Sequence, residues 1–452
     1  MMRTRQAHNL FISLSPRYLP NNHPNLILLS GINPMQGQIP FGVADYFWEE
    51  ALQRQELITS LLATFRAWGY GDVTPPAFEY AASLTAQASA GLQAEMYRFL
   101  DRDGSTLALR PEFTTPVARL VGTRLHDWPM PQRFCYAGSV FRYVAPQAGR
   151  QREFWQAGVE LFGASSPDAD AEVLALTAET LNVAGLADYR IVLGQICYFG
   201  GLLAALKLTP DQCDSLRWAI ERKSEPALAD FLRETPLRTG QRQAVEALPG
   251  LSGSNIHQVI DRAERHCLNT EMHRALVNLR AVVDALSGYG VLESVVLDLT
   301  EIRSLGYYTG ISFEAMAPES GFSIGSGGRY DDLVGHFGPS QPAVGVAVGV
   351  ERLLLARQRQ SGRLASLRPI PPHALVISHQ HPAALAQVQR WRAEGYRLQM
   401  EVNGRPLADV LAYAVRIGAG QVLVWQGEQF IAYRRDADNS FTPRQGEISF
   451  DE

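Results

Sequence analysis

Two long stretches rich in aromatic and β-branched residues, 133–143 and 153–162, constrain the fold of this chain most strongly. That composition is typical of neighbouring β-strands. Arg142 ends the first stretch, while Gln156 and Glu160 lie four residues apart on the second and therefore point to one face of the sheet. Buried polar groups are costly unless paired. Two interpretations stay open: an Arg142–Glu160 ion pair across the strands, or a pocket for a ligand carrying an amine and a carboxylate.

The surrounding pattern mixes helices and strands without regular alternation and predicts an α+β fold. Leu57, Leu61 and Phe65 recur at helical spacing within a helix over 45–69. Asp103-Gly104 predicts a hairpin of strands 96–100 and 106–110, and Pro111 a helix reaching Leu125. Further segments follow, namely a helix from Ser166-Pro167, strands over 189–193, 295–299, 307–315 and 345–349, and a turn at the glycines 321, 325, 327 and 328.

The length of 452 residues suggests two or three domains. We predict a disordered N-terminal extension over 1–37, a core over 38–368, and a helical insertion over 197–288 within that core. Prolines at 369, 371 and 372 mark a linker. Beyond it, strands over 374–378, 397–402 and 421–425 alternate with helices over 383–394 and 406–417, which predicts a small α/β domain over 373–452 with a mostly parallel sheet.

Composition excludes several classes of function. The four cysteines form no close pair, so neither a zinc site nor a disulfide framework is expected, and we predict no metal and no cofactor. No apolar stretch is long enough to span a bilayer, and we expect a cytoplasmic protein. With 41 basic against 46 acidic residues, the net charge of −5 does not favour a nucleic-acid partner. Motifs of hydrolases and zinc proteases are missing.

Ordered motifs resemble the histidyl-tRNA synthetase-like class II family over about residues 38–356, and most closely its non-aminoacylating branch, the regulatory subunits of ATP phosphoribosyltransferase. They are Pro40–Asp45, Trp68–Tyr70, Leu109–Thr114, Phe141–Tyr143, Gln156–Glu160, Arg303–Gly310, Gly327–Asp331 and Gly349–Arg352. The resemblance implies a core sheet of six or seven antiparallel strands flanked by helices. It also places class II motif 1 at 57–76, motif 2 at 133–162 and motif 3 at 343–356, and makes the C-terminal domain anticodon-binding-like.

The same resemblance implies a histidine pocket. Glu112, Thr114, Arg142 and Gln156 would hold the amino and carboxylate groups of the ligand, and Glu160 would meet the imidazole together with Tyr308. We add Arg303 and Tyr307 to this predicted site. In a synthetase, Arg142, Arg303 and Arg352 would also contact ATP or stabilise charge during adenylation.

Departures from the synthetase pattern favour the regulatory branch. Val144 stands where a synthetase has the Glu that accepts from the adenine amino group, an omission worth about 1–3 kcal/mol. Phe113 replaces Gly in Glu-Gly-Thr, and Gly306 replaces an Asp. The C-terminal domain carries eight arginines against nine acidic residues, so it lacks the basic surface that an anticodon stem needs.

We therefore predict a non-catalytic regulatory subunit that binds the short catalytic subunit of ATP phosphoribosyltransferase, with no catalytic residues of its own. It would serve the first step of histidine biosynthesis and sense L-histidine as a feedback effector. The resemblance implies a hetero-octamer built on dimers that use motif 1. The alternatives are a true histidyl-tRNA synthetase, which would aminoacylate tRNA-His with ATP, and a stand-alone histidine-binding protein.

Overall fold

The computed structural model describes residues 37–144, 151–302, 307–318, 320–362, 369–444 and 448–450. The predicted N-terminal extension thus lies outside the described residues except for Gly37. The chain divides near residue 365 into two compact units, except that residues 46–52 group with the second unit.

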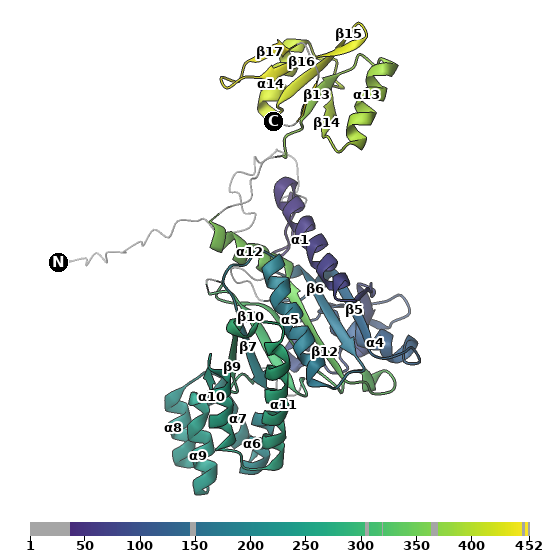
Figure 1. Cartoon of the computed structure of the whole chain (residues 1–452). Helices are drawn as coiled ribbons and strands as arrows, with labels where there is room; N and C mark the ends of the chain where they lie inside the picture. The colour runs from purple at the N-terminus through teal and green to yellow at the C-terminus, as the bar shows by residue number, and fades with distance from the viewer. Residues whose placement is uncertain are drawn as a thin grey trace, which may run out of the picture. The chain divides into compact units, whose positions relative to one another are not determined.

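The first unit is built on a nine-stranded sheet with the order β1-β5-β6-β12-β11-β10-β7-β9-β8 (Figure 1). The six strands from β5 to β7 in this order are antiparallel, whereas β1 pairs with β5, and β9 with β7, in parallel. The predicted α+β class with an antiparallel core sheet is confirmed. The strands are Gly71–Asp72 (β1), Gln132–Phe141 (β5), Glu153–Phe162 (β6), Arg190–Gln195 (β7), Ser252–Gly253 (β8), Val295–Asp298 (β9), Ile311–Met316 (β10), Ser323–Arg329 (β11) and Ala343–Gly349 (β12).

Helices pack against this sheet and bury the apolar stripes seen in the sequence. Helix α1 (Trp48–Ala67) buries Leu57, Ile58, Leu61 and Phe65, and the chain leaves it through Gly69, whose φ of +85° suits glycine. Helix α5 (Pro167–Val183) packs on β12 and on α11 (Thr270–Ser287), which in turn packs on β7. Helix α12 (Val350–Ser361) follows β12 directly.

The predicted helical stretch over 197–288 holds a compact group of helices beside the β7–β9 side of the sheet (Figure 1). Its apolar side chains share one continuous hydrophobic core with the sheet rather than forming a separate one. The group consists of α6 (Ile196–Leu206), α7 (Pro210–Glu221), α8 (Glu225–Glu234), α9 (Thr239–Ala247), α10 (Ile256–Glu264) and α11, and the short strand β8 interrupts it.

A three-stranded sheet of order β2-β4-β3 carries the predicted hairpin, which is confirmed. Its strands are Phe78–Tyr80 (β2), Arg98–Leu100 (β3) and Thr106–Leu109 (β4), and the short helices α2 (Ala81–Leu84) and α3 (Ala90–Ala94) lie between β2 and β3 in the chain. The next helix, α4 (Thr114–Arg124), begins three residues after Pro111, so the predicted start was wrong. Pro111 and Glu112 instead lie in the short non-helical segment that leads into it.

The glycine cluster also corrects the sequence analysis, because Gly325, Gly327 and Gly328 lie within strand β11 rather than in a turn. A Cβ atom on Gly327 would lie 2.5 Å from Cζ of Phe313, and one on Gly328 would lie 2.6 Å from the carbonyl oxygen of Ile311. Glycine is therefore needed here for close packing rather than for chain reversal.

We expect Gly327→Ala to lower the free energy of unfolding by about 1–3 kcal/mol, because the added methyl group overpacks the sheet against Phe313. The matched control is Gly200→Ala in helix α6, where a Cβ would meet nothing within 4 Å. That change should be neutral or stabilising by up to about 1 kcal/mol. Thermal unfolding followed by circular dichroism compares the two variants, and equal melting temperatures would contradict the packing argument.

The second unit has one sheet of order β14-β13-β15-β16-β17. The predicted alternation is confirmed for β13 (Ala374–Ile377), α13 (Pro382–Ala393), β14 (Leu398–Met400), α14 (Leu407–Ile417) and β15 (Gln421–Gln426), whose strands pair in parallel. The sequence analysis missed the antiparallel strands β16 (Gln429–Arg435) and β17 (Phe441–Arg444). Separate apolar clusters cover the two faces of this sheet. In the described parts of both units, no helix is long and apolar enough to cross a membrane.

Candidate functional site

The Glu160 carboxylate is the centre of a polar cluster on the large sheet. Its side chain lies on β6 and the residue is only 1% exposed. Oε1 accepts hydrogen bonds from Thr114 Oγ1 at 2.8 Å and from the Tyr136 hydroxyl at 2.9 Å, and the Tyr330 hydroxyl donates to Oε2. Burial dominates over these donors and raises the pKa of Glu160 to about 8.

Four different elements supply this cluster. Thr114 is the first residue of α4, Tyr136 lies on β5 beside β6, and Tyr330 follows β11 directly. Glycines make room for the long side chains on the sheet face. A Cβ on Gly158 would lie 2.6 Å from the Tyr136 hydroxyl oxygen, and one on Gly345 would collide with the Glu160 carboxylate.

Tyr307 and Tyr308 line the same cluster, as the sequence analysis predicted. The Tyr307 ring stacks on Tyr330 at 6.0 Å between centroids and meets Tyr308 edge-on at 5.0 Å. Burial raises the pKa of both phenols, and Glu160 and Glu112 raise it further through their charge. At neutral pH both tyrosines therefore stay protonated and can donate hydrogen bonds.

Glu112, Arg142 and Gln156 lie around this cluster in different ways. Glu112 accepts from the Thr115 backbone N–H at 3.1 Å and so caps the start of α4. Arg142 Nε donates to the Pro111 carbonyl at 2.9 Å, and burial lowers the pKa of its guanidinium although Glu112 opposes that effect. The side-chain oxygen of Gln156 is buried without a hydrogen-bond partner among the described residues, so it is free to accept from a ligand.

The geometry excludes one of the two interpretations left open by the sequence. Hydroxyl groups hold Glu160, whereas Arg142 lies past the end of β5 and bonds to the backbone of Pro111. The cross-strand ion pair between them is therefore wrong. An unmet acceptor beside a carboxyl group and several phenols favours the pocket interpretation instead.

The structure brings seven of the eight predicted site residues to one region, and Arg303 lies outside the described residues. Sequence reasoning missed Tyr136 and Tyr330. Tyr136 lies two residues from Gly138 on β5 and therefore shares its face of the sheet. Because Gly138 pairs with Gln156, this spacing could have placed Tyr136 on the face of the predicted site. Tyr330 offered no local signal, because it lies 170 residues from Glu160 along the chain. Within the described ranges, no group of three or more His, Cys, Asp or Glu side chains could hold a metal ion.

Comparison with known proteins gives this site a context. A family model described as histidyl-tRNA synthetase matches residues 42–353. The crystal structure of an ATP phosphoribosyltransferase regulatory subunit/histidyl-tRNA synthetase from Bacillus halodurans C superposes with a TM-score of 0.77 at 28% identity, covering 87% of this chain and all of that one. Histidyl-tRNA synthetase from Nostoc sp. PCC 7120 shares the fold with a TM-score of 0.73 at 22% identity, covering 91% of this chain and 97% of that one.

Curated relatives decide the branch. The ATP phosphoribosyltransferase regulatory subunit of Moorella thermoacetica is 39% identical over 391 residues, which cover 86% of this chain and 98% of the relative. That of Geobacter sulfurreducens is 34% identical over 89% of this chain and 91% of the relative. The chain belongs to the family of ATP phosphoribosyltransferase regulatory subunits.

Phe113 and Val144 set this regulatory-subunit chain apart from the synthetase pattern, and Phe113 lies beside the cluster. Phe113 is 2% exposed and is sandwiched between the Tyr136 ring at 4.3 Å and the Arg110 guanidinium at 4.1 Å. A Cβ atom on Gly138 would lie 2.8 Å from the Phe113 ring. Phe113 therefore covers β5 at Gly138, the residue that pairs with Gln156 on β6. Val144 is 9% exposed, and its side chain offers no hydrogen-bond acceptor.

The raised pKa of Glu160 predicts how stability depends on pH. The folded state binds the proton on Glu160 more tightly than the unfolded state does. The resulting stabilisation of the folded state is fully present below the ordinary pKa near 4.5 and is lost as the pH rises through about 8. Relative to Glu160→Gln, which cannot titrate, we expect the natural chain to lose roughly 4 kcal/mol between about pH 5 and pH 8. Parallel pH profiles of unfolding for the two proteins would contradict this expectation.

Proposed function

We propose that this chain is a non-catalytic regulatory subunit of ATP phosphoribosyltransferase. It binds the short catalytic subunit, activates it for the first step of histidine biosynthesis, and makes the complex sensitive to inhibition by L-histidine. The observation that carries this proposal is the buried polar cluster around Glu160, combined with Val144 at the position where the family resemblance implies that a synthetase recognises adenine.

The pocket supports histidine as the effector. Glu160 can exchange a hydrogen bond with an imidazole nitrogen, Gln156 Oε1 can accept from the ligand ammonium, and the phenols of Tyr307 and Tyr308 can complete the contacts. Arg303 and Arg142 would meet the carboxylate, as the family resemblance implies. For histidine to inhibit, it must bind more tightly to the inactive state of the complex than to the active one.

Val144 and Phe113 support the absence of aminoacylation. Without an acceptor at position 144, the adenine amino group would be desolvated and unpaired, which costs about 1–3 kcal/mol. The Phe113 ring fills space over Gly138, and a glycine at position 113 would leave that space empty. The change at Val144 would weaken adenine recognition, while the cluster around Glu160 is intact.

Assembly with other chains is supported by exposed aromatic residues on the three-stranded sheet. Phe78 is 53% exposed, Tyr80 58% and Phe99 40%, and the Phe78 and Phe99 rings contact each other at 5.9 Å. Contiguous exposed apolar groups of this kind mark protein interfaces. They follow motif 1 in the chain, which fits the proposed dimer within a hetero-octamer of four subunits of each kind.

One specific observation favours the alternative, a histidyl-tRNA synthetase. Arg142 and Arg352 lie close enough for the charge of Arg352 to lower the pKa of Arg142, so two guanidinium groups remain near one another beside the pocket. Paired guanidinium groups suit phosphate binding. The test must therefore measure both activities.

The experiment compares phosphoribosyltransferase activity of the short catalytic subunit with and without this chain, beside histidine-dependent ATP–pyrophosphate exchange by this chain alone. We expect strong activation that histidine suppresses, and no exchange. Glu179→Gln, a change distant from the cluster, should activate like the natural chain. Robust exchange would mean that the chain is a synthetase, and the absence of activation would overturn the regulatory proposal.

A further inference from the structure

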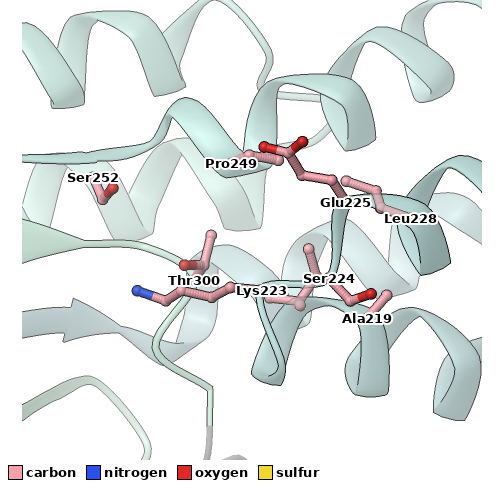
Figure 2. Close-up of a pocket in the computed structure, with 9 residues that line it drawn as sticks. Ala219, Lys223, Ser224, Glu225, Leu228, Pro249, Ser252 and Thr300 are labelled. Atoms are coloured by element: carbon pink, nitrogen blue, oxygen red, sulfur yellow. The ribbon is translucent and has the colours of Figure 1, made fainter.

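A second pocket lies away from the Glu160 cluster, where the turn between α7 and α8 approaches the sheet edge formed by β8 and β9 (Figure 2). Its volume is about 180 Å³. Ile220 and Leu228 form an apolar floor, and both residues are almost fully buried. Lys223, Glu225, Ser252 and Thr300 supply polar groups around it. The question is which ligand this combination fits.

Lys223 is held in a defined position at this pocket. It occupies the turn between α7 and α8 with a φ of +49°, a left-handed conformation that residues with a side chain adopt rarely. Its Nζ donates to Asp298 Oδ2 at 2.9 Å, and Asp298 is itself fixed because Oδ1 accepts from the Thr300 backbone N–H at 2.9 Å. An ammonium group has three donors, so the Asp298 bond leaves capacity for a ligand carboxylate.

Glu225 provides the opposite charge. It lies in the first turn of α8, which begins after Ser224, and its side chain is exposed to solvent. Figure 2 shows the Glu225 carboxylate and the Lys223 ammonium projecting from different sides of the pocket rather than toward each other. A positive and a negative group are thus presented separately above an apolar floor.

We propose that this pocket binds a small zwitterionic amino acid with an apolar side chain. Lys223 contacts the ligand carboxylate, Glu225 contacts its ammonium group, and the side chain packs on Ile220 and Leu228. The volume is slightly larger than the roughly 150 Å³ of an engineered apolar cavity that holds benzene, which suits a small amino acid. The inference does not depend on the proposed regulatory function, because it concerns a different part of the chain.

The test uses the full chain and L-leucine as the probe, with binding followed by isothermal titration calorimetry. We expect binding that weakens about tenfold or more in Glu225→Gln and in Lys223→Met. The matched control is Glu221→Gln on α7, an exposed acid outside the pocket lining, which should bind like the natural chain. Glu160→Ala should also keep leucine binding, which separates this site from the histidine pocket.

Two half-ligands test the requirement for both charges. We expect 4-methylpentanoate, which lacks the amine, and 3-methylbutylamine, which lacks the carboxylate, each to bind at least tenfold more weakly than leucine. Lys223→Met also removes the Asp298 ion pair and could disturb the turn, so Glu225→Gln provides the independent variant. The absence of leucine binding at about 10 mM, or equal binding of leucine and either half-ligand, would overturn the proposal.

Discussion

Histidine affinity of the complex with the catalytic subunit is expected to fall about a hundredfold when Glu160 is replaced by alanine. The change removes the carboxyl group that accepts hydrogen bonds from three hydroxyls. The hydroxyl groups of Thr114, Tyr136 and Tyr330 would then face a cavity. Leaving a buried hydrogen-bonding group unsatisfied costs about 1–3 kcal/mol, and a factor of a hundred corresponds to about 2.7 kcal/mol. Isothermal titration calorimetry with L-histidine measures the loss directly.

Two further variants make this result specific to the site. Glu160→Gln keeps the shape and one acceptor, so it should lose less affinity than the alanine variant. Glu179→Gln changes a carboxylate that accepts from the Trp68 indole at 2.8 Å, far along α5 from the cluster, and should leave histidine binding unchanged. Full affinity in a folded Glu160→Ala protein would place histidine binding elsewhere in the complex.

Removing the guanidinium of Arg329 is expected to lower the free energy of unfolding by about 3–5 kcal/mol. Arg329 Nε donates to Asp170 Oδ1 at 2.9 Å, and the side chains are only 7% and 0% exposed. Burial raises the pKa of Asp170 to about 6 even with this partner present. Arg329→Met would leave a buried carboxyl group without its counter-charge, and thermal unfolding measures the consequence.

The appropriate control is an ion pair at the surface. Arg66 and Asp72 pair at 2.8 Å, but their side chains are about half exposed, so Arg66→Met should cost far less stability than Arg329→Met. The double variant Asp170→Leu/Arg329→Met should recover part of the stability, since a buried pair can be replaced by apolar groups more easily than it can be broken. Equal losses in both single variants would contradict this account.

Local patterns in the sequence were enough to predict most elements and part of the site. The aromatic and β-branched residues over 133–143 and 153–162 located β5 and β6, and the alternation of side chains along a strand placed Gln156 and Glu160 on one face. The alternation of strand and helix patterns after the linker likewise predicted β13, β14 and β15 from local residues alone. The glycines of β11 were misread, because a glycine run indicates a turn unless the close neighbours on β10 and β12 are known.

What the sequence could not reveal depends on contacts between distant segments. Strand β16 was missed although Gly427, with a φ of +64°, turns the chain between β15 and β16, because charged residues at 434–436 obscured its alternation. The partners of Glu160 came partly from the family resemblance and partly from the fold. Tyr330 reaches the carboxylate only because β11 and β12 bring it across the sheet.

The spacing of the Glu160 partners along the chain has a consequence for biosynthesis. Thr114, Tyr136 and Tyr330 lie 46, 24 and 170 residues from Glu160. Contacts of such long range form late in folding, and a ribosome supplies residue 330 long after residue 160. A nascent chain that ends before β11 therefore cannot form the complete cluster around Glu160, so any ligand that this cluster binds can stabilise the protein only once nearly the whole first unit has been synthesised.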